Sequence, residues 1–129
     1  MSSGSFFRSN EGRRIVICDH NQLLQSITGL LRMSGYIVFQ AYDAGAAREL
    51  CGQLGNIELL ILNTSGTGTD SPQLVRDIRG DIPGMAVLHI GAARLDGMPD
   101  DVPTLGESFT AASLLATVEG LLPRTGITV

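Results

Sequence analysis

The feature that most constrains the fold is an almost continuous apolar run at residues 57–62, in which Glu58 is the only polar residue. A strand with apolar side chains on both of its sides needs cover on both faces, which is typical of a central strand in a parallel sheet. The run Ile15–Cys18 has the same character. The chain is therefore expected to build a sheet whose central strands are buried between two layers.

Segments with a helical spacing of apolar residues lie between these runs. In residues 22–34, Leu and Ile side chains recur one, three and four residues apart, and Gly35 follows as a helix stop. Ser71 and Pro72 are typical of an N-cap and a first helical position, and Gly80 is expected to end the helix they open. The helices predicted in this way span residues 22–34, 43–54 (capped by Asp43), 71–79 and 110–122 (stopped by Pro123).

Strands and helices alternate along the chain, which indicates an α/β fold with a five-stranded parallel sheet covered on both sides. Residues 91–103 interrupt this order, because two Gly, two Pro and three Asp leave no apolar period there. The fourth connecting helix is therefore expected to be short or missing. The predicted strands span residues 13–18, 36–40, 57–62, 85–90 and 102–105.

Composition limits the classes of function. The chain has 129 residues, a formal net charge of −4 and 43% hydrophobic residues, which is typical of one acidic globular domain. All nine basic side chains are Arg, so Schiff-base and Lys-based phosphate chemistry is excluded. The acidic balance argues against direct binding to nucleic acid or an anionic membrane. We expect a cytoplasmic protein with a disordered lead at 1–12, a domain at 13–122, and a tail or the start of a linker at 123–129.

Few isolated residues suggest chemistry. Cys18 and Cys51 lie in or beside apolar stretches and are interpreted as buried thiols rather than as part of a disulfide or zinc site. His89 lies within an apolar strand and is expected to be a hydrogen-bonded core or edge residue. Gly66 and Gly68 could cradle a phosphate at a helix N-terminus, but the Lys of a phosphate loop is absent.

The motifs at the predicted strand ends follow a recognisable order. Residues 17–22 (ICDHNQ) end the first strand, and residues 59–71 (LLILNTSGTGTDS) end the third and carry a Gly and a later Asp. Ile82 and Pro83 precede the fourth strand, and residues 105–110 (LGESFT) follow the fifth. With these motifs, residues 13–122 resemble the receiver domain of two-component response regulators. The resemblance implies a flavodoxin-like, doubly wound sheet with strand order 2-1-3-4-5.

The resemblance also implies that the phosphoacceptor site is degenerate. The family's acceptor Asp falls on Asn63, whose amide has no anionic oxygen to form an acyl phosphate. The acidic pair that binds magnesium falls on Asp19 and His20, so Asp19 is the only remaining acid of that set. One carboxylate is a poor cage for magnesium. No metal ion or other cofactor is therefore expected.

Three further positions of the family's switch also differ. The Thr or Ser that bonds the phosphoryl group falls on Gly91, the Lys falls on Glu107, and the switch aromatic falls near Thr104. Once the acceptor is neutral, the Lys has no excess of negative charge to offset. Glu107 can then lie near Asp19 or pair with His20, although solvated side chains at both strand ends are an equal alternative.

These observations favour a pseudo-receiver, a phosphorylation-independent interaction module that is not an enzyme. The alternative is a small-molecule or phosphate-binding flavodoxin-like domain, possibly a fragment of an enzyme. The expected partner is a protein such as a histidine kinase, an output domain or a second copy of the chain. Because the fourth helix is short or missing, the last helix should expose apolar residues that another chain covers. The face expected to do so carries Ala112, Leu115, Ala116 and Glu119.

Overall fold

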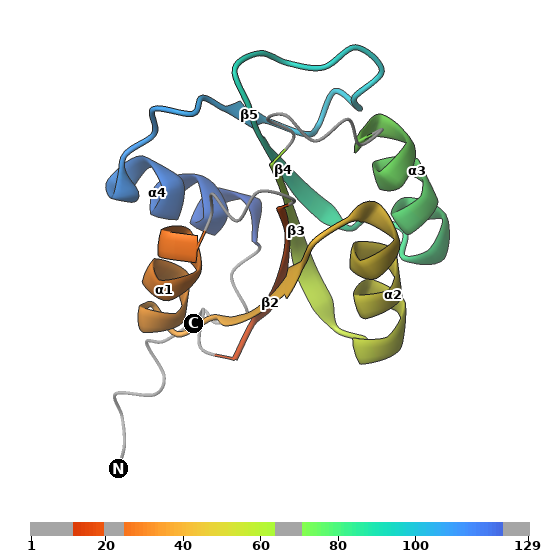
Figure 1. Cartoon of the computed structure of the whole chain (residues 1–129), viewed down its shortest axis with the longest axis horizontal. Coiled ribbons are helices and arrows are strands. Elements are labelled where there is room, and N and C mark those ends of the chain that lie inside the picture. The colour runs from red at the N-terminus through yellow and green to blue at the C-terminus, as the bar shows by residue number, and fades with distance from the viewer. Residues whose placement is uncertain (1–11, 20–24, 64–70, 123–129) are drawn as a thin grey trace, which may run out of the picture.

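The computed structural model describes residues 12–19, 25–63 and 71–122, and these form a single α/β unit (Figure 1). Its sheet is parallel and five-stranded, with the order β2-β1-β3-β4-β5. This confirms the flavodoxin-like prediction. The strands are β1 (Arg14–Asp19), β2 (Ile37–Ala41), β3 (Ile57–Asn63), β4 (Ala86–Ile90) and β5 (Thr104–Leu105), and the helices are α1 (Gln25–Met33), α2 (Ala44–Leu54), α3 (Ser71–Asp81) and α4 (Ala111–Leu121).

Helices cover both faces of the sheet, as the apolar runs predict. Helices α1 and α4 lie on one side and α2 and α3 on the other (Figure 1). The central strand β3 sends Leu60 and Leu62 into the core on the α2 and α3 side. Its neighbouring residues Leu59 and Ile61 enter the core on the α1 and α4 side. Alternation along one strand therefore supplies two separate apolar cores.

Several element bounds differ from the sequence-based ones. Helix α3 begins at Ser71 and runs through Gly80 to Asp81, so Gly80 does not end it. The Ile82 N–H still bonds the Ile78 carbonyl at 2.7 Å, and the left-handed residue is Gly84, with φ 83°. Pro83 cannot continue the helix, and Gly84 then turns the chain toward β4.

The other differences are small. Strand β3 extends to Asn63, and β5 contains only Thr104–Leu105. Gly12, assigned to the lead by composition, donates its N–H to the Gly35 carbonyl at 3.0 Å. The predicted start of the first helix at residue 22 lies outside the described residues. No helix in the described part of the chain is long and apolar enough to cross a membrane.

Residues 91–103, which we call the strap, connect β4 to β5 without a helix. This confirms the prediction that the fourth helix is short or missing. The strap still contributes to the core, because its buried side chains Met98 and Val102 join the cluster on the α2 and α3 side, and Leu95 packs against it. An irregular segment thus covers the apolar area that a helix would otherwise cover.

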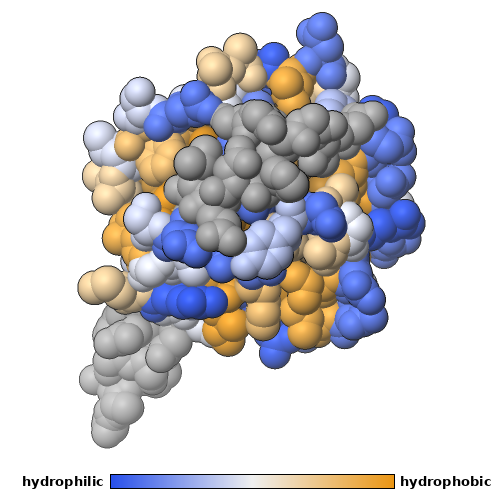
Figure 2. Space-filling model, viewed as in Figure 1, coloured by the Kyte–Doolittle hydropathy of each residue, from blue (hydrophilic) through white to orange (hydrophobic). Residues whose placement is uncertain are grey.

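Of the apolar residues that α4 was expected to expose, Ala112 and Ala116 are exposed, whereas Leu115 is half-buried. Leu114 and Val118 are fully buried, and Leu115 and Leu121 pack partly buried against the same core. The exposed large apolar residues among those described are Met33, Ile37 and Tyr42, none of them in α4. The strap lies on the opposite face of the sheet, and α1 packs beside α4. The outer side of α4 is instead built from small residues, and in Figure 2 apolar and pale residues predominate there while hydrophilic ones gather over α2 and α3.

Candidate functional site

The ends of β1 and β3 bring Asp19 and Asn63 together. Each is the last residue of its strand, and the two are paired in the parallel register. The Asn63 amide Nδ2 donates a hydrogen bond to Asp19 Oδ1 at 3.1 Å. Asp19 is 6% exposed and Asn63 5% exposed. Because the carboxyl ends of parallel strands meet at one edge, the sequence predicted this convergence, and the structure adds the bond between the two side chains.

This hydrogen bond decides what the pair can do. A buried carboxylate needs donors, and the Asn63 N–H supplies one to the acid. The neutral amide therefore removes the repulsion that a second carboxylate at the same distance would create. The pair is thus a satisfied acid–amide contact rather than a nucleophile.

Of the described residues at this edge, Asp19 and Asn63 are not arranged to hold a magnesium ion. Magnesium takes oxygen ligands in a near-octahedral arrangement, whereas Asn63 turns an N–H donor toward the Asp19 carboxylate. Among the described residues, no group of three or more His, Cys, Asp or Glu side chains could hold a metal ion. We therefore derive no chemistry from a metal at this edge of the sheet.

Of the remaining residues predicted at this edge, Gly91 and Glu107 are described and the others are not. Gly91 is buried just after β4 and donates its N–H to the Leu105 carbonyl at 3.1 Å, so its role here is to join β4 to β5. Glu107 follows β5 and is exposed. His20, Gly66 and Gly68 lie outside the described residues. The predicted contact of Glu107 with Asp19 or His20 therefore stays a prediction.

A second polar pair, between His89 and Thr104, lies in the sheet. His89 is 0% exposed, and its Nδ1 is hydrogen-bonded to Thr104 Oγ1 at 3.0 Å. Burial lowers the pKa of His89, and the positive charge of Arg94 lowers it further, so the imidazole is neutral at pH 7. This confirms His89 as a hydrogen-bonded core residue. Sequence reasoning did not identify its partner, because Thr104 comes from another strand.

The cysteines behave as predicted. Cys18 and Cys51 are both buried free thiols. Burial raises the pKa of each to about 11, and the charge of nearby Asp43 adds to the increase at Cys18. Since the thiolate is the reactive form, neither side chain is suited to nucleophilic chemistry.

The architecture matches that of solved receiver domains. The receiver domain of the hybrid histidine kinase CckA has 28% sequence identity and a TM-score of 0.72, over 85% of this chain and 99% of that one. A response regulator receiver domain from Clostridium thermocellum has 24% identity and a TM-score of 0.70, over 85% and 93%. The Thermotoga maritima response regulator TrrA, solved with magnesium and BeF, has 22% identity and a TM-score of 0.74, over 85% and 99%.

These structures define the fold. The chain has the fold of a response-regulator receiver domain, which is the fold that its motifs predict. No protein-family model matches the sequence, and no curated protein matches it.

Proposed function

We propose that this domain is a pseudo-receiver, a signalling module that acts through protein contacts without accepting a phosphoryl group. The observation that supports this most directly is the buried hydrogen bond from Asn63 to Asp19. Phosphoryl transfer to a receiver-like site needs a carboxylate nucleophile, and an amide cannot form the acyl phosphate. The acceptor position is thus occupied by a group that stabilises its neighbour instead of reacting.

Two substitutions near the same edge support the proposal. Gly91 has no hydroxyl to bond a phosphoryl oxygen, and Glu107 would repel a phosphate where a cation would attract it. An acid–base catalytic set would need at least one pair of suitable groups there. We therefore infer that the domain is not an enzyme and needs no cofactor.

The partner that we propose is a protein: a histidine kinase, an output domain or a second copy of the chain. The contact face that we propose is the outer side of α4, with exposed Ala112, Ala116 and Glu119 and half-buried Leu115. Small side chains let another backbone approach closely, and they lose little conformational entropy when covered. This face therefore suits a helix or sheet edge of a partner.

Phosphoryl transfer tests the proposal. After incubation with magnesium and acetyl phosphate, intact-mass spectrometry is expected to show no added phosphate, because Asn63 offers no carboxylate. A receiver domain with an intact acceptor Asp serves as the positive control for the reagent. A stoichiometric adduct that is lost in mild base would overturn the proposal.

Magnesium binding is expected to be absent in calorimetric titration at millimolar magnesium, because Asp19 is the only acid left of the family's set. The double variant His20→Asp/Asn63→Asp restores two carboxylates and should give a saturable heat. The single variant His20→Asp is the matched control, since it keeps the Asn63 amide against Asp19. Tight binding by the native chain would contradict this prediction.

The α4 face is tested by adding charge to it. Ala112→Glu combined with Ala116→Glu should abolish self-association or partner binding, measured by light scattering, because each carboxylate would have to lose water at the contact. Gly52→Glu combined with Gly80→Glu, at exposed positions of α2 and α3, adds the same two charges elsewhere and is the control for net charge. If the double variant keeps the native assembly, this face is not the interface.

A further inference from the structure

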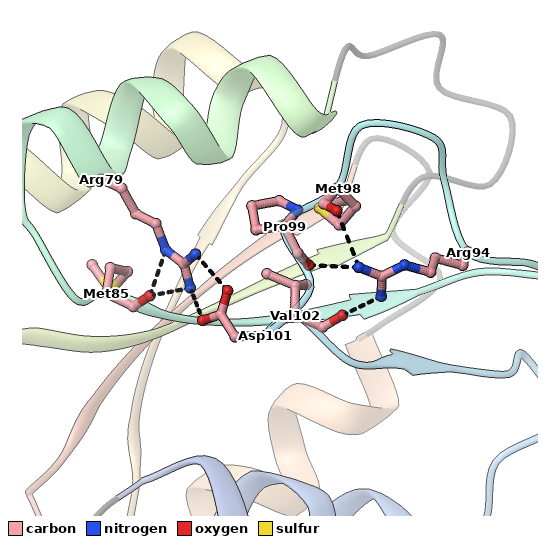
Figure 3. A network of polar contacts seen from close by, with 7 residues as sticks. All are labelled: Arg79, Met85, Arg94, Met98, Pro99, Asp101 and Val102. Atoms are coloured by element: carbon pink, nitrogen blue, oxygen red, sulfur yellow. Dashed lines mark hydrogen bonds and ion pairs between the residues drawn. The ribbon is translucent and has the colours of Figure 1, made fainter.

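Arg94 holds the strap, residues 91–103, in its conformation by donating hydrogen bonds to carbonyl groups of the strap (Figure 3). One Nη atom of Arg94 donates to the Val102 carbonyl at 2.8 Å. The other donates to the carbonyls of Met98 at 3.0 Å and Pro99 at 2.6 Å. Arg94 and all three acceptors belong to the strap, so these bonds hold its two ends together. A segment without helical hydrogen bonds thereby keeps a defined conformation.

A different arginine attaches the strap to the rest of the domain. Arg79, near the end of α3, forms a bidentate pair with Asp101 of the strap, at 2.9 and 2.7 Å. The same guanidinium donates to the Met85 carbonyl, just before β4, at 3.0 and 2.9 Å (Figure 3). Arg79 thus links three segments at one point. Its side chain is 22% exposed and that of Asp101 is 67% exposed, so water reaches this contact.

Two further contacts hold the strap along α3. Met98 is 5% exposed and Val102 0% exposed, and both join the core cluster that contains Leu74 of α3. Gly97 of the strap lies near the first turn of α3. It has φ 85°, and a Cβ built on it would lie 3.6 Å from the Pro72 Cβ. The strap therefore follows α3 from its first turn to its last and has one charged attachment, at Arg79, among the contacts described.

We propose that the strap opens and closes as one unit, with the Arg79–Asp101 pair as its attachment. The bonds within the strap, from Arg94 and from the Met98 and Val102 amides, break in the same opening step, because the strap forms no helix that could hold them once the attachment is lost. The Arg79–Asp101 pair and the contacts of Met98 and Val102 must break. Opening would uncover the apolar side chains beneath and change the surface beside β5. Because the unit depends on no phosphoryl chemistry, it can operate in a domain with an amide at the acceptor position.

Hydrogen exchange of two amides tests this. The N–H of Met98 bonds the Leu95 carbonyl at 3.3 Å, and that of Val102 bonds the Pro99 carbonyl at 3.1 Å. In Asp101→Asn, both amides should exchange about five- to tenfold faster by NMR, by the same factor, while β3 amides are unchanged. Asp100→Asn is the matched control, because its carboxylate is fully exposed and lies 3.9 Å from Arg94.

A second pair of variants tests the attachment from its other side. Arg79→Met should accelerate the same two amides at least as much, and adding Asp101→Asn should produce little further change. Arg76→Met, on the same helix and bonded to Gln73, is the control.

Three results would overturn the proposal. Unchanged exchange in Asp101→Asn would mean that the pair does not hold the strap closed. Different factors for Met98 and Val102 would mean that the strap does not move as one unit. Equal acceleration of β3 amides would mean that the domain unfolds globally instead of opening at the strap.

Discussion

Replacing Asn63 with Asp is expected to lower the free energy of unfolding by about 2–3 kcal/mol at pH 7. The variant places two buried carboxylates at the distance where Nδ2 now meets Asp19 Oδ1, 3.1 Å. The chain contains no Lys to offset their charge. Urea unfolding monitored by circular dichroism measures the loss.

The same variant should depend on pH in a defined direction. Repulsion makes the folded Asn63→Asp pair hold one proton more tightly than the unfolded chain does. The stability of the variant relative to the native chain therefore rises as pH falls. The decrease in its free energy of unfolding should be smaller at pH 4.5 than at pH 7. The double variant Asp19→Asn/Asn63→Asp restores one acid and one amide and should recover most of the stability. If Asn63→Asp is as stable as the native chain at pH 7, the acid–amide account of the site is wrong.

Leu114→Ala is expected to lower the free energy of unfolding by about 3 kcal/mol. Leu114 is 0% exposed and belongs to the core between α4 and the sheet, so truncation leaves a cavity that rigid neighbours cannot fill. The loss would appear in urea unfolding as a lower midpoint with an unchanged slope.

The adjacent residue gives the matched control. Leu115 is half-buried on the same helix, and Leu115→Ala should cost about 1 kcal/mol. Leu114→Ala should cost more than Leu115→Ala because the sheet and α1 cover the side of α4 that carries Leu114. Equal losses at the two positions would contradict that arrangement.

Much of the fold could be predicted because each regular element leaves a local pattern. The apolar run at 57–62 required cover on both faces, and the structure supplies it with two cores divided along β3. The meeting of Asp19 and Asn63 was also predictable, because the carboxyl ends of parallel strands share an edge. The direction of the hydrogen bond between them was not, since it depends on side-chain packing at that edge.

The bounds of elements were less predictable because partners outside the element decide them. Gly80 is a common helix stop, yet α3 continues past it, and the chain turns at Gly84 after Pro83. The cover of α4 was also missed. The sequence pattern shows that α4 has an apolar face. The structure shows that the strap packs on the other side of the sheet, so the apolar face of α4 is covered without it.

The order of strands and helices, the lack of a fourth connecting helix, and the neutral amide of Asn63 beside Asp19 all follow from the sequence alone. These follow from which residues avoid water, which residues break a helix, and which functional groups a side chain carries. How the strap is held is visible only in the folded chain, because Arg79 and Asp101 are 22 residues apart and no periodicity relates them. Apolar burial repeats along a chain and can be recognised locally, whereas a specific polar contact depends on two backbones that folding alone brings together.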